Sequence, residues 1–226
     1  MLVKKWMKTP AITVQINTSL EEAMKLIDQH GIHMLPVLEK KKLVGIVTDR
    51  DLRRSEAAAA STMEIYELKT IFAEMKVSSI MTADLVTIPL DYTIEEAAEL
   101  LLENKISGLP VVDGNGDLAG VITKTDIFRV IISLTGLRKR GIQFAMIVED
   151  RAGSIREVTE VIRSAGGRVA SILTSYDDVP SGFRNVYIRM YDIDRSKLDQ
   201  VKKGLREKSK LMYMVDRREN VREIYQ

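Results

Sequence analysis

The chain has 226 residues, of which 45% are hydrophobic and 29% are charged, and its formal net charge is +2. This composition is typical of a globular protein, and the near-neutral balance excludes the basic surface of a nucleic-acid-binding protein. The sequence contains no cysteine, which excludes disulfides, thiol nucleophiles and cysteine-ligated metals. No apolar run reaches the ~20 residues of a membrane-spanning helix, and Pro10 precedes any signal-peptide core. We therefore expect a cytoplasmic protein without a membrane or nucleic-acid partner.

Two stretches with helical periodicity begin an internal repeat. Residues 19–27 read SLEEAMKLI and residues 93–101 read TIEEAAELL, with apolar residues three and four positions apart. Thr18 or Ser19 in the first copy, and Thr93 in the second, are residue types that cap helix N-termini, and glutamates follow in the first turn. The pattern predicts two equivalent amphipathic helices.

Each predicted helix is followed by two strand-like runs separated by a short polar turn, as in a hairpin. The runs are residues 31–39 and 42–48 in the first copy, and residues 105–113 and 117–123 in the second. A further helix beginning at Thr48 or Thr123 closes each copy. The predicted order in each half is therefore strand, helix, strand, strand, helix.

The segment between the copies, residues 55–76, carries apolar residues at helical spacing. They are Ile65, Leu68, Phe72 and Met75. Such a stripe is typical of a helix that packs on a core. We therefore predict a packed linker helix rather than a flexible tether.

The pattern changes near residue 142. The run IQFAMIVE alternates apolar and polar residues as a half-buried strand does, and a helical stretch, two more strand-like runs, a second helical stretch and a last strand follow. The order βαββαβ predicts an antiparallel sheet with two helices on one face. Ser154 and Glu157 have the spacing of a capping box at the first helix.

Both copies of the repeat hold a threonine three residues before an aspartate at a predicted helix start. The pairs are Thr48 with Asp51 in GIVTDRDL, and Thr123 with Asp126 in GVITKTDI. This spacing suits a helix cap, in which the hydroxyl accepts a backbone N–H and the acid reaches back. It also suits a nucleotide, because a helix N-terminus attracts phosphate and an aspartate one turn in can accept the ribose hydroxyls. The residues alone leave both interpretations open.

The Leu-Pro-Val strands, the Gly-Ile-Val-Thr and Gly-Val-Ile-Thr strands and the Thr-x-x-Asp pairs together resemble a tandem cystathionine-β-synthase (CBS) domain pair, or Bateman module. The βαββαβ order and the turn EDRAGSI are similar to those of an ACT domain. The combination resembles the acetoin-utilisation B-type proteins. We therefore expect an α+β protein, with a CBS pair of internal pseudo-twofold symmetry followed by a ferredoxin-like βαββαβ (ACT-like) domain. The expected segments are CBS motif 1 (1–58), linker helix (59–76), CBS motif 2 (77–136), hinge (137–141) and ACT-like domain (142–226).

The CBS resemblance implies two adenine-nucleotide clefts. In the first, Thr48, Arg50, Asp51 and His33 would hold the ribose and phosphate, with Val86 and Ile106 around the adenine. In the second, Thr123, Lys124 and Asp126 would hold them, with Ile12 and Ile32 around the base and Ser107 at the position equivalent to His33. Because Ser107 is uncharged, we expect the first cleft to bind phosphorylated ligands more tightly. His33 has a structural alternative, as a hydrogen-bonded, half-buried residue before the Leu-Pro strand.

The ACT resemblance implies an amino-acid pocket after the first strand of the third unit. It would be formed by Asp150, Arg151, Ala152, Gly153 and Ser154, with Gly153 letting backbone N–H groups approach a carboxylate. The alternative is a well-formed strand-to-helix turn without a ligand.

The sequence carries no motif for catalysis. Two histidines three residues apart cannot form a multi-histidine metal site, and no P-loop or G-x-G-x-x-G occurs. We therefore expect a regulatory protein without a metal or obligatory cofactor. It would bind AMP, ADP, ATP or S-adenosylmethionine as a regulatory ligand, and an amino acid on its ACT-like part, and signal to a protein partner. We also expect at least a homodimer and a mobile joint at residues 135–143; the alternative function is a dimerisation or scaffold subunit without a ligand.

Overall fold

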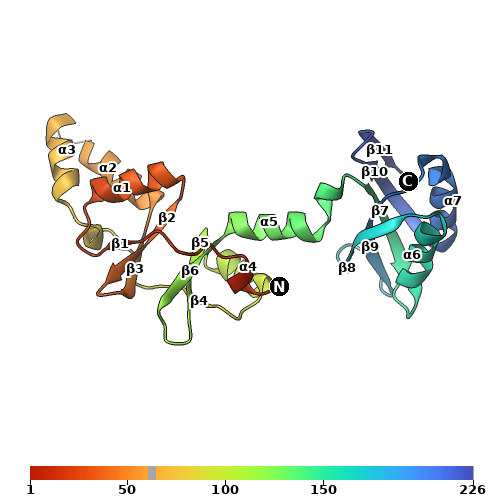
Figure 1. Cartoon of the computed structure of the whole chain (residues 1–226), viewed down its shortest axis with the longest axis horizontal. Coiled ribbons are helices and arrows are strands. Elements are labelled where there is room, and N and C mark those ends of the chain that lie inside the picture. Colours follow the sequence, from red (N-terminus) through yellow and green to blue (C-terminus); the bar gives the residue numbers. More distant parts are fainter. Residues whose placement is uncertain (61–64, 226) are drawn as a thin grey trace. The chain divides into compact units, whose positions relative to one another are not determined.

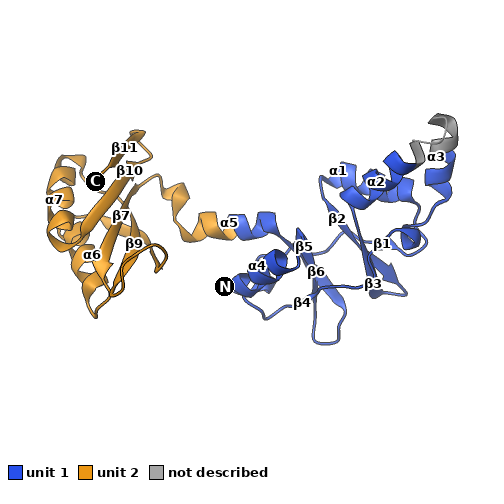
Figure 2. Ribbon diagram, turned by 180° about the vertical axis from the view of Figure 1, so that it is seen from behind, with its two compact units in different colours: residues 1–128 blue, residues 129–226 orange. Residues whose placement is uncertain are grey.

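The computed structural model describes the backbone of residues 1–60 and 65–225, and the side chains of residues 1–58 and 70–225. The chain forms two compact units, Met1–Phe128 and Arg129–Gln226 (Figure 2). The boundary between them falls inside helix α5 (Lys124–Leu134), ahead of the expected hinge at residues 137–141. The five segments expected from the sequence stay a prediction.

Unit 1 contains the two copies of the repeat, each with a three-stranded sheet (Figure 1). The first copy consists of β1 (Val14–Gln15), α1 (Leu20–His30), β2 (Met34–Glu39), β3 (Lys42–Thr48) and α2 (Asp49–Ala60). The second consists of β4 (Ile88–Pro89), α4 (Ile94–Glu103), β5 (Gly108–Val112), β6 (Leu118–Thr123) and α5. In each sheet the first strand pairs in parallel with the second, which pairs antiparallel with the third. The predicted order of elements is confirmed in both copies.

Side chains of the predicted types cap the first helix of each copy. Ser19 is the N-cap of α1, and its Oγ accepts a hydrogen bond from the Glu22 backbone N–H at 3.2 Å. Thr93 and Glu96 form a reciprocal capping box at the start of α4. Each cap satisfies N–H groups that have no partner inside the helix.

Each copy also pairs with the chain segment that leads into the other copy. The bridges are Leu2 to Thr93 and Lys8 to Val121 in the second copy, and Ser19 to Lys76 and Ile46 to Thr82 in the first. These segments contain the short 3-10 helices η1 (Val3–Lys5) and η2 (Val77–Ser79). The chain therefore crosses between the copies twice, once through Ile12 and once through Val86.

The glycine in each repeated phrase permits this exchange of segments. A Cβ on Gly45 would lie 2.5 Å from Met81 Sδ, and a Cβ on Gly120 would lie 2.6 Å from the Lys8 carbonyl oxygen. Any larger residue would push the crossing segment off the sheet. The repeated Gly-x-x-Thr thus combines a close backbone approach with a helix cap.

Residues 55–60 and 65–74 of the linker between the copies are helical. Helix α2 continues to Ala60, and α3 spans Ile65–Glu74. Phe72 is buried in the core of the first copy and Met75 packs against that core, as the predicted stripe requires. The side chains of Ile65 and Leu68 lie outside the described residues.

Unit 2 is a five-stranded sheet covered by two helices. Its elements are η3 (Leu137–Lys139), β7 (Ile142–Glu149), α6 (Ser154–Ser164), β8 (Arg168–Ser175), β9 (Phe183–Tyr191), η4 (Arg195–Lys197), α7 (Leu198–Lys208), β10 (Lys210–Asp216) and β11 (Val221–Ile224). The strand order is β11-β10-β7-β9-β8, and all neighbours are antiparallel. The predicted βαββαβ order is confirmed, while β11 was not predicted.

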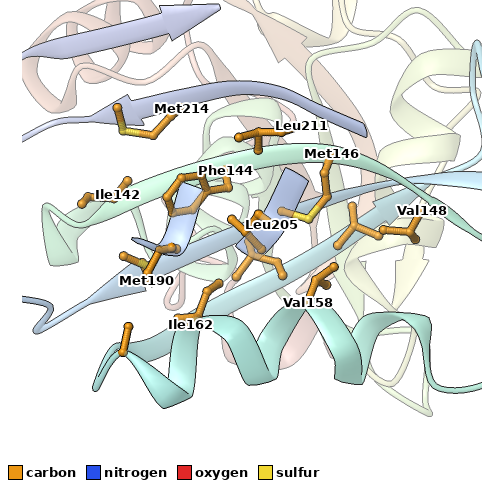
Figure 3. Close-up of a cluster of buried hydrophobic side chains, with 14 residues drawn as sticks. Ile142, Phe144, Met146, Val148, Val158, Ile162, Met190, Leu205, Leu211 and Met214 are labelled. Carbon is orange, nitrogen blue, oxygen red and sulfur yellow. The ribbon is translucent and has the colours of Figure 1, made fainter. Parts of the chain in front are cut away.

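The core of unit 2 lies between the sheet and helices α6 and α7 (Figure 3). Alternate residues of β7, including Phe144 and Met146, are fully buried against Val158 and Ile162 of α6 and Leu205 of α7. The other side of β7 faces away from both helices, as period-2 alternation requires.

The start of unit 2 is anchored to its sheet. The Thr135 carbonyl oxygen, in the expected mobile joint, accepts hydrogen bonds from Ser171 Oγ at 2.9 Å and from Arg189 Nε at 2.7 Å. A Cβ on Gly136, which has φ of 63°, would meet the Ala170 side chain at 3.0 Å. These contacts hold the segment before η3 against β8 and β9.

Candidate functional site

Thr48 ends β3, and Asp51 lies in the first turn of α2. Asp51 Oδ2 accepts hydrogen bonds from the Thr48 backbone N–H at 3.0 Å and from the Thr48 hydroxyl at 2.6 Å, while the Asp51 N–H donates to Thr48 Oγ1 at 3.3 Å. Thr123 and Asp126 repeat this arrangement at 3.0, 2.6 and 3.4 Å. In the protein alone, both pairs are therefore helix caps.

The two carboxylates differ in their surroundings. The Asp126 side chain is only 2% exposed, whereas Asp51 is half-buried. Within the part of the chain that the structure describes, Asp51 Oδ1 accepts no hydrogen bond, so this oxygen remains available to a ligand hydroxyl. The Asp51 cap is thus the more accessible of the two.

His33 lies directly before β2, where no other element covers it. Its side chain is 79% exposed, so the expected half-buried alternative is wrong. His33 Nδ1 lies 3.1 Å from Asp49 Oδ2, and Asp49 Oδ1 accepts the Arg50 backbone N–H at 2.9 Å. Asp49 was not among the predicted site residues, although it stands directly after Thr48 in the run TDRD.

Hairpin pairing brings the predicted phosphate-side residues together in each copy. Met34 pairs with Thr48, and the Asp49 N–H donates to the His33 carbonyl oxygen at 3.2 Å. The same contacts recur in the second copy, where the Lys124 N–H donates to the Ser107 carbonyl oxygen at 3.0 Å. Each helix N-terminus therefore lies beside the residue that precedes the Leu-Pro strand.

Two cationic side chains accompany these helix starts. Arg50 is exposed and Lys124 is half-buried, and neither side chain has an ion-pair partner among the described residues. Both lie in the first turn, where backbone N–H groups already create a positive potential. Asp49 and Asp51 oppose this potential in the first turn of α2, whereas Asp126 alone opposes it in α5.

The four predicted base-lining residues lie at the junctions between the copies. Ile32 and Ile106 precede the two Leu-Pro strands. The starts of these strands lie close together, as shown by the 3.0 Å between a Cβ built on Gly108 and Met34 Cε. Ile12 and Val86 lie on the two crossing segments. All four are half-buried, and Ile12 and Ile32 pack against the core of the first copy.

The predicted amino-acid pocket of unit 2 is a turn with its own salt bridges. Arg151 donates to both carboxylate oxygens of Glu157 at 2.8 and 2.9 Å and to Glu149 at 2.9 Å. This arginine lowers the pKa of Glu157, chiefly through the hydrogen bonds. The predicted capping box of Ser154 and Glu157 is therefore wrong. Gly153, at φ of 89°, is the N-cap of α6 and has no side chain to donate or accept.

Arg184 of β9 points to this turn and was missed by sequence reasoning. Its Nη2 donates to Ser154 Oγ at 3.1 Å, and its Nε lies 3.5 Å from Asp150 Oδ1. That Nε is buried and makes no hydrogen bond among the described residues. Ala152 and Gly153 are exposed, and the space around a Cβ on Gly153 is open. No local signal in the sequence connects position 184 to the turn.

In the parts of the chain that the structure describes, no cluster of three or more histidine, aspartate or glutamate side chains is arranged to hold a metal ion. The helices described there are all too short or too polar to cross a membrane.

The family model of the CBS domain matches residues 3–58 and 77–133, which together make up half of the chain. The chain belongs to the CBS-domain family. The two copies of unit 1 are its tandem CBS pair, so this part of the resemblance is confirmed.

Relatives of the CBS pair occur as small proteins and as parts of enzymes. A CBS domain-containing protein of Dictyostelium discoideum is 35% identical over 134 residues, covering 59% of this chain and 92% of that protein. Inosine-5'-monophosphate dehydrogenase of Korarchaeum cryptofilum is 38% identical over 117 residues, which cover 52% of this chain but only 21% of the dehydrogenase. The solved CBS domain pair of protein MJ0100, in complex with 5'-methylthioadenosine and S-adenosyl-L-methionine, is 31% identical with a TM-score of 0.50, covering 58% of this chain and 99% of that one.

Proposed function

We propose that the CBS pair is a regulatory module that binds an adenine-containing ligand, an adenine nucleotide or S-adenosylmethionine, in two clefts. The observation that carries this proposal is the repeated Thr-Asp cap, whose corresponding hydrogen bonds agree within 0.1 Å between the copies. The adenosyl ligands of the MJ0100 pair support the ligand class. In this proposal each cap is a preorganised ribose site.

In the first cleft, ligand binding would keep the cap contacts and use the carboxylate oxygen that they leave free. Asp51 Oδ1 is free to accept a ribose hydroxyl, while Oδ2 continues to hold Thr48. A phosphate would lie at the N-terminus of α2, near Arg50 and His33, where it would compete with Asp49 for the imidazole. In the second cleft Lys124 would hold the phosphate alone, because Ser107 carries no charge.

The base would lie between the two copies. Val86 and Ile106 would flank the adenine of the first cleft, and Ile12 and Ile32 that of the second. A ligand that bridges the ribose site of one copy and the apolar residues of the other would stabilise the pairing of the two copies. Ligand binding would thereby make the CBS pair more rigid, and this change would alter its affinity for a protein partner.

The same module would act as a homodimer. Helix α5 exposes large apolar side chains at Phe128, Ile131, Ile132 and Leu134, and a second copy of the chain would cover this stripe. This stripe also favours the alternative function, a dimerisation or scaffold subunit without a ligand. Phe128→Glu with Ile131→Glu should then yield a monomer by light scattering.

Unit 2 would be an ACT-like domain that binds an amino acid at the turn before α6. The Gly153 backbone N–H and the Arg184 guanidinium would hold the carboxylate, since the Ser154 N–H already donates to the Arg151 carbonyl oxygen at 3.3 Å. The whole protein would be a cytoplasmic regulatory protein without catalytic activity of its own. Arg151 would stabilise the turn and would not contact the ligand, because Glu149 and Glu157 already accept hydrogen bonds from its guanidinium.

A ligand screen by urea unfolding tests the adenine proposal. The only tryptophan, Trp6, is half-buried in unit 1, so its fluorescence reports the CBS pair and not unit 2. A ligand at 100 times its dissociation constant should stabilise unit 1 by about 2.7 kcal/mol. We expect this from AMP, ADP, ATP or S-adenosylmethionine but not from inosine monophosphate at the same concentration. No stabilisation by any adenine compound would favour the scaffold alternative.

A further inference from the structure

Unit 2 contains an open hollow beside the segment that follows α5. Its volume is about 490 Å³, and it is lined by Leu137, Arg138, Arg140 and Arg217. We call this feature the arginine hollow. The lining residues come from η3 and its C-terminal side and from the turn between β10 and β11, so segments far apart in the sequence bring three exposed arginines to one hollow.

The three arginines of the hollow lack counter-ions. Among the described residues, Arg138, Arg140 and Arg217 make no hydrogen bond and no ion pair through their side chains. The acids next to Arg217 in the chain are engaged elsewhere, since Asp216 accepts two hydrogen bonds from Arg195, at 3.0 and 3.1 Å. Glu219 also lies nearest to Arg195, at 3.6 Å. No acidic side chain of the described residues therefore forms an ion pair with the arginines of the hollow.

A fourth arginine adds to this charge from inside the unit. Arg189 is only 4% exposed, and its Nη1 is buried without a hydrogen-bond partner in the described residues. Burial lowers the pKa of Arg189, and the nearby Arg217 cation lowers it further. A buried cation close to another cation is unfavourable unless an anion balances the pair.

The backbone of the lining segment is held in an uncommon conformation. Arg140 has φ of 49°, in the left-handed region that side chains other than glycine and asparagine rarely adopt. Thr135 is held by Arg189 and Ser171, so the turn between these contacts and β7 is anchored at one end. Six other non-glycine residues of the described chain share this region, so the conformation contributes the position of Arg140 at the hollow and is not itself the argument for a site.

We propose that the arginine hollow binds a small molecule that carries phosphate groups. Guanidinium forks pair with phosphate oxygens in a bidentate manner, and three of them require more than one negative charge. A single carboxylate would leave most of this charge unbalanced. The site is separate from the CBS clefts, which belong to unit 1. It is also separate from the turn before α6, since β7 runs between the two places, over roughly 25 Å at about 3.3 Å per residue.

Calorimetric titration of inorganic pyrophosphate into the full chain tests the proposal. We expect saturable binding, and at least a tenfold loss of affinity in Arg138→Gln/Arg217→Gln. Arg140→Asn should lose affinity as well, because asparagine tolerates the left-handed conformation but carries no charge. Arg163→Gln, an exposed arginine of α6, is the matched control and should bind like the wild type.

Two further titrations distinguish the arginine hollow from the CBS clefts and from a surface that attracts any polyanion. Arg50→Gln/Lys124→Gln removes the side chains proposed to hold phosphate in the CBS clefts and should retain the pyrophosphate binding that Arg138→Gln/Arg217→Gln loses. Citrate, a tricarboxylate, should bind at least tenfold more weakly than pyrophosphate. The proposal is overturned by the absence of pyrophosphate binding, by unchanged affinity in the double arginine variant, or by citrate binding equal to that of pyrophosphate.

Discussion

Substitution of the two capping aspartates should have unequal effects on the stability of the CBS pair. Each carboxylate accepts hydrogen bonds from a threonine N–H and hydroxyl at the same distances. Either substitution therefore removes the same helix cap. Loss of a cap costs about 1 kcal/mol. Asp126 is 2% exposed, however, so Asp126→Ala also removes the acceptor from a buried position where water does not readily replace it, at an additional ~1–3 kcal/mol. We therefore expect about 1 kcal/mol for Asp51→Ala and about 2–4 kcal/mol for Asp126→Ala.

Urea unfolding followed by Trp6 fluorescence measures this difference in unit 1. The Trp6 segment pairs with the second copy through Lys8 and Val121, so it is released when that copy unfolds. Asp91→Ala, at an exposed acid of the same unit without a partner in the described residues, is the control and should change the free energy of unfolding by less than about 0.5 kcal/mol. Equal losses of stability in the two capping variants, or a larger loss in Asp51→Ala, would show that the burial of Asp126 does not make its substitution more costly.

Further predictions concern unit 2. Burial raises the pKa of Asp216, but hydrogen bonds from Arg195 and from two backbone N–H groups lower it below its ordinary value. Unit 2 should therefore lose stability as the pH falls below about 4. An acid titration followed by tyrosine circular dichroism measures this loss. Asp216→Ala should abolish that component of the pH dependence and lower stability by about 2–4 kcal/mol in urea. Gly141→Ala should destabilise unit 2 by about 3 kcal/mol, since its Cβ would lie 1.9 Å from the Met190 carbonyl oxygen in β9. Amides of residues 137–141 should exchange faster than those of residues 144–148, and equal protection would contradict a mobile joint.

Periodicity predicted most of the fold because the elements bury one face each. The helices of the repeat and the alternating strand that begins unit 2 were evident from spacing alone. The exchange of segments between the CBS copies has no such signal, since the bridge from Lys8 to Val121 joins residues far apart in the chain. Strand β11 was missed for a related reason, because its four residues, Val221–Ile224, are too few to show alternation clearly.

The candidate site was predictable where chemistry is local. Thr48 and Asp51 lie one turn apart, so their spacing alone indicates a cap and a candidate ligand contact. The partner of a longer side chain was not predictable in this way. Arg184 reaches Ser154 across the start of the sheet, and Glu157 pairs with Arg151 instead of forming the expected cap because a guanidinium offers two parallel hydrogen bonds.

Titration calorimetry of the adenine ligand that most stabilises unit 1 tests the central claim, that the repeated caps are ribose sites. We expect two binding events in the wild type and one in each of Asp51→Ala and Asp126→Ala. For a phosphorylated ligand, the event that remains in Asp126→Ala should be tighter than the event that remains in Asp51→Ala. The double variant should bind none, provided that each protein is folded at the start of the titration. Unchanged binding in the folded double variant would contradict the assignment of the repeated Thr-Asp pairs as ribose sites and leave them as helix caps alone.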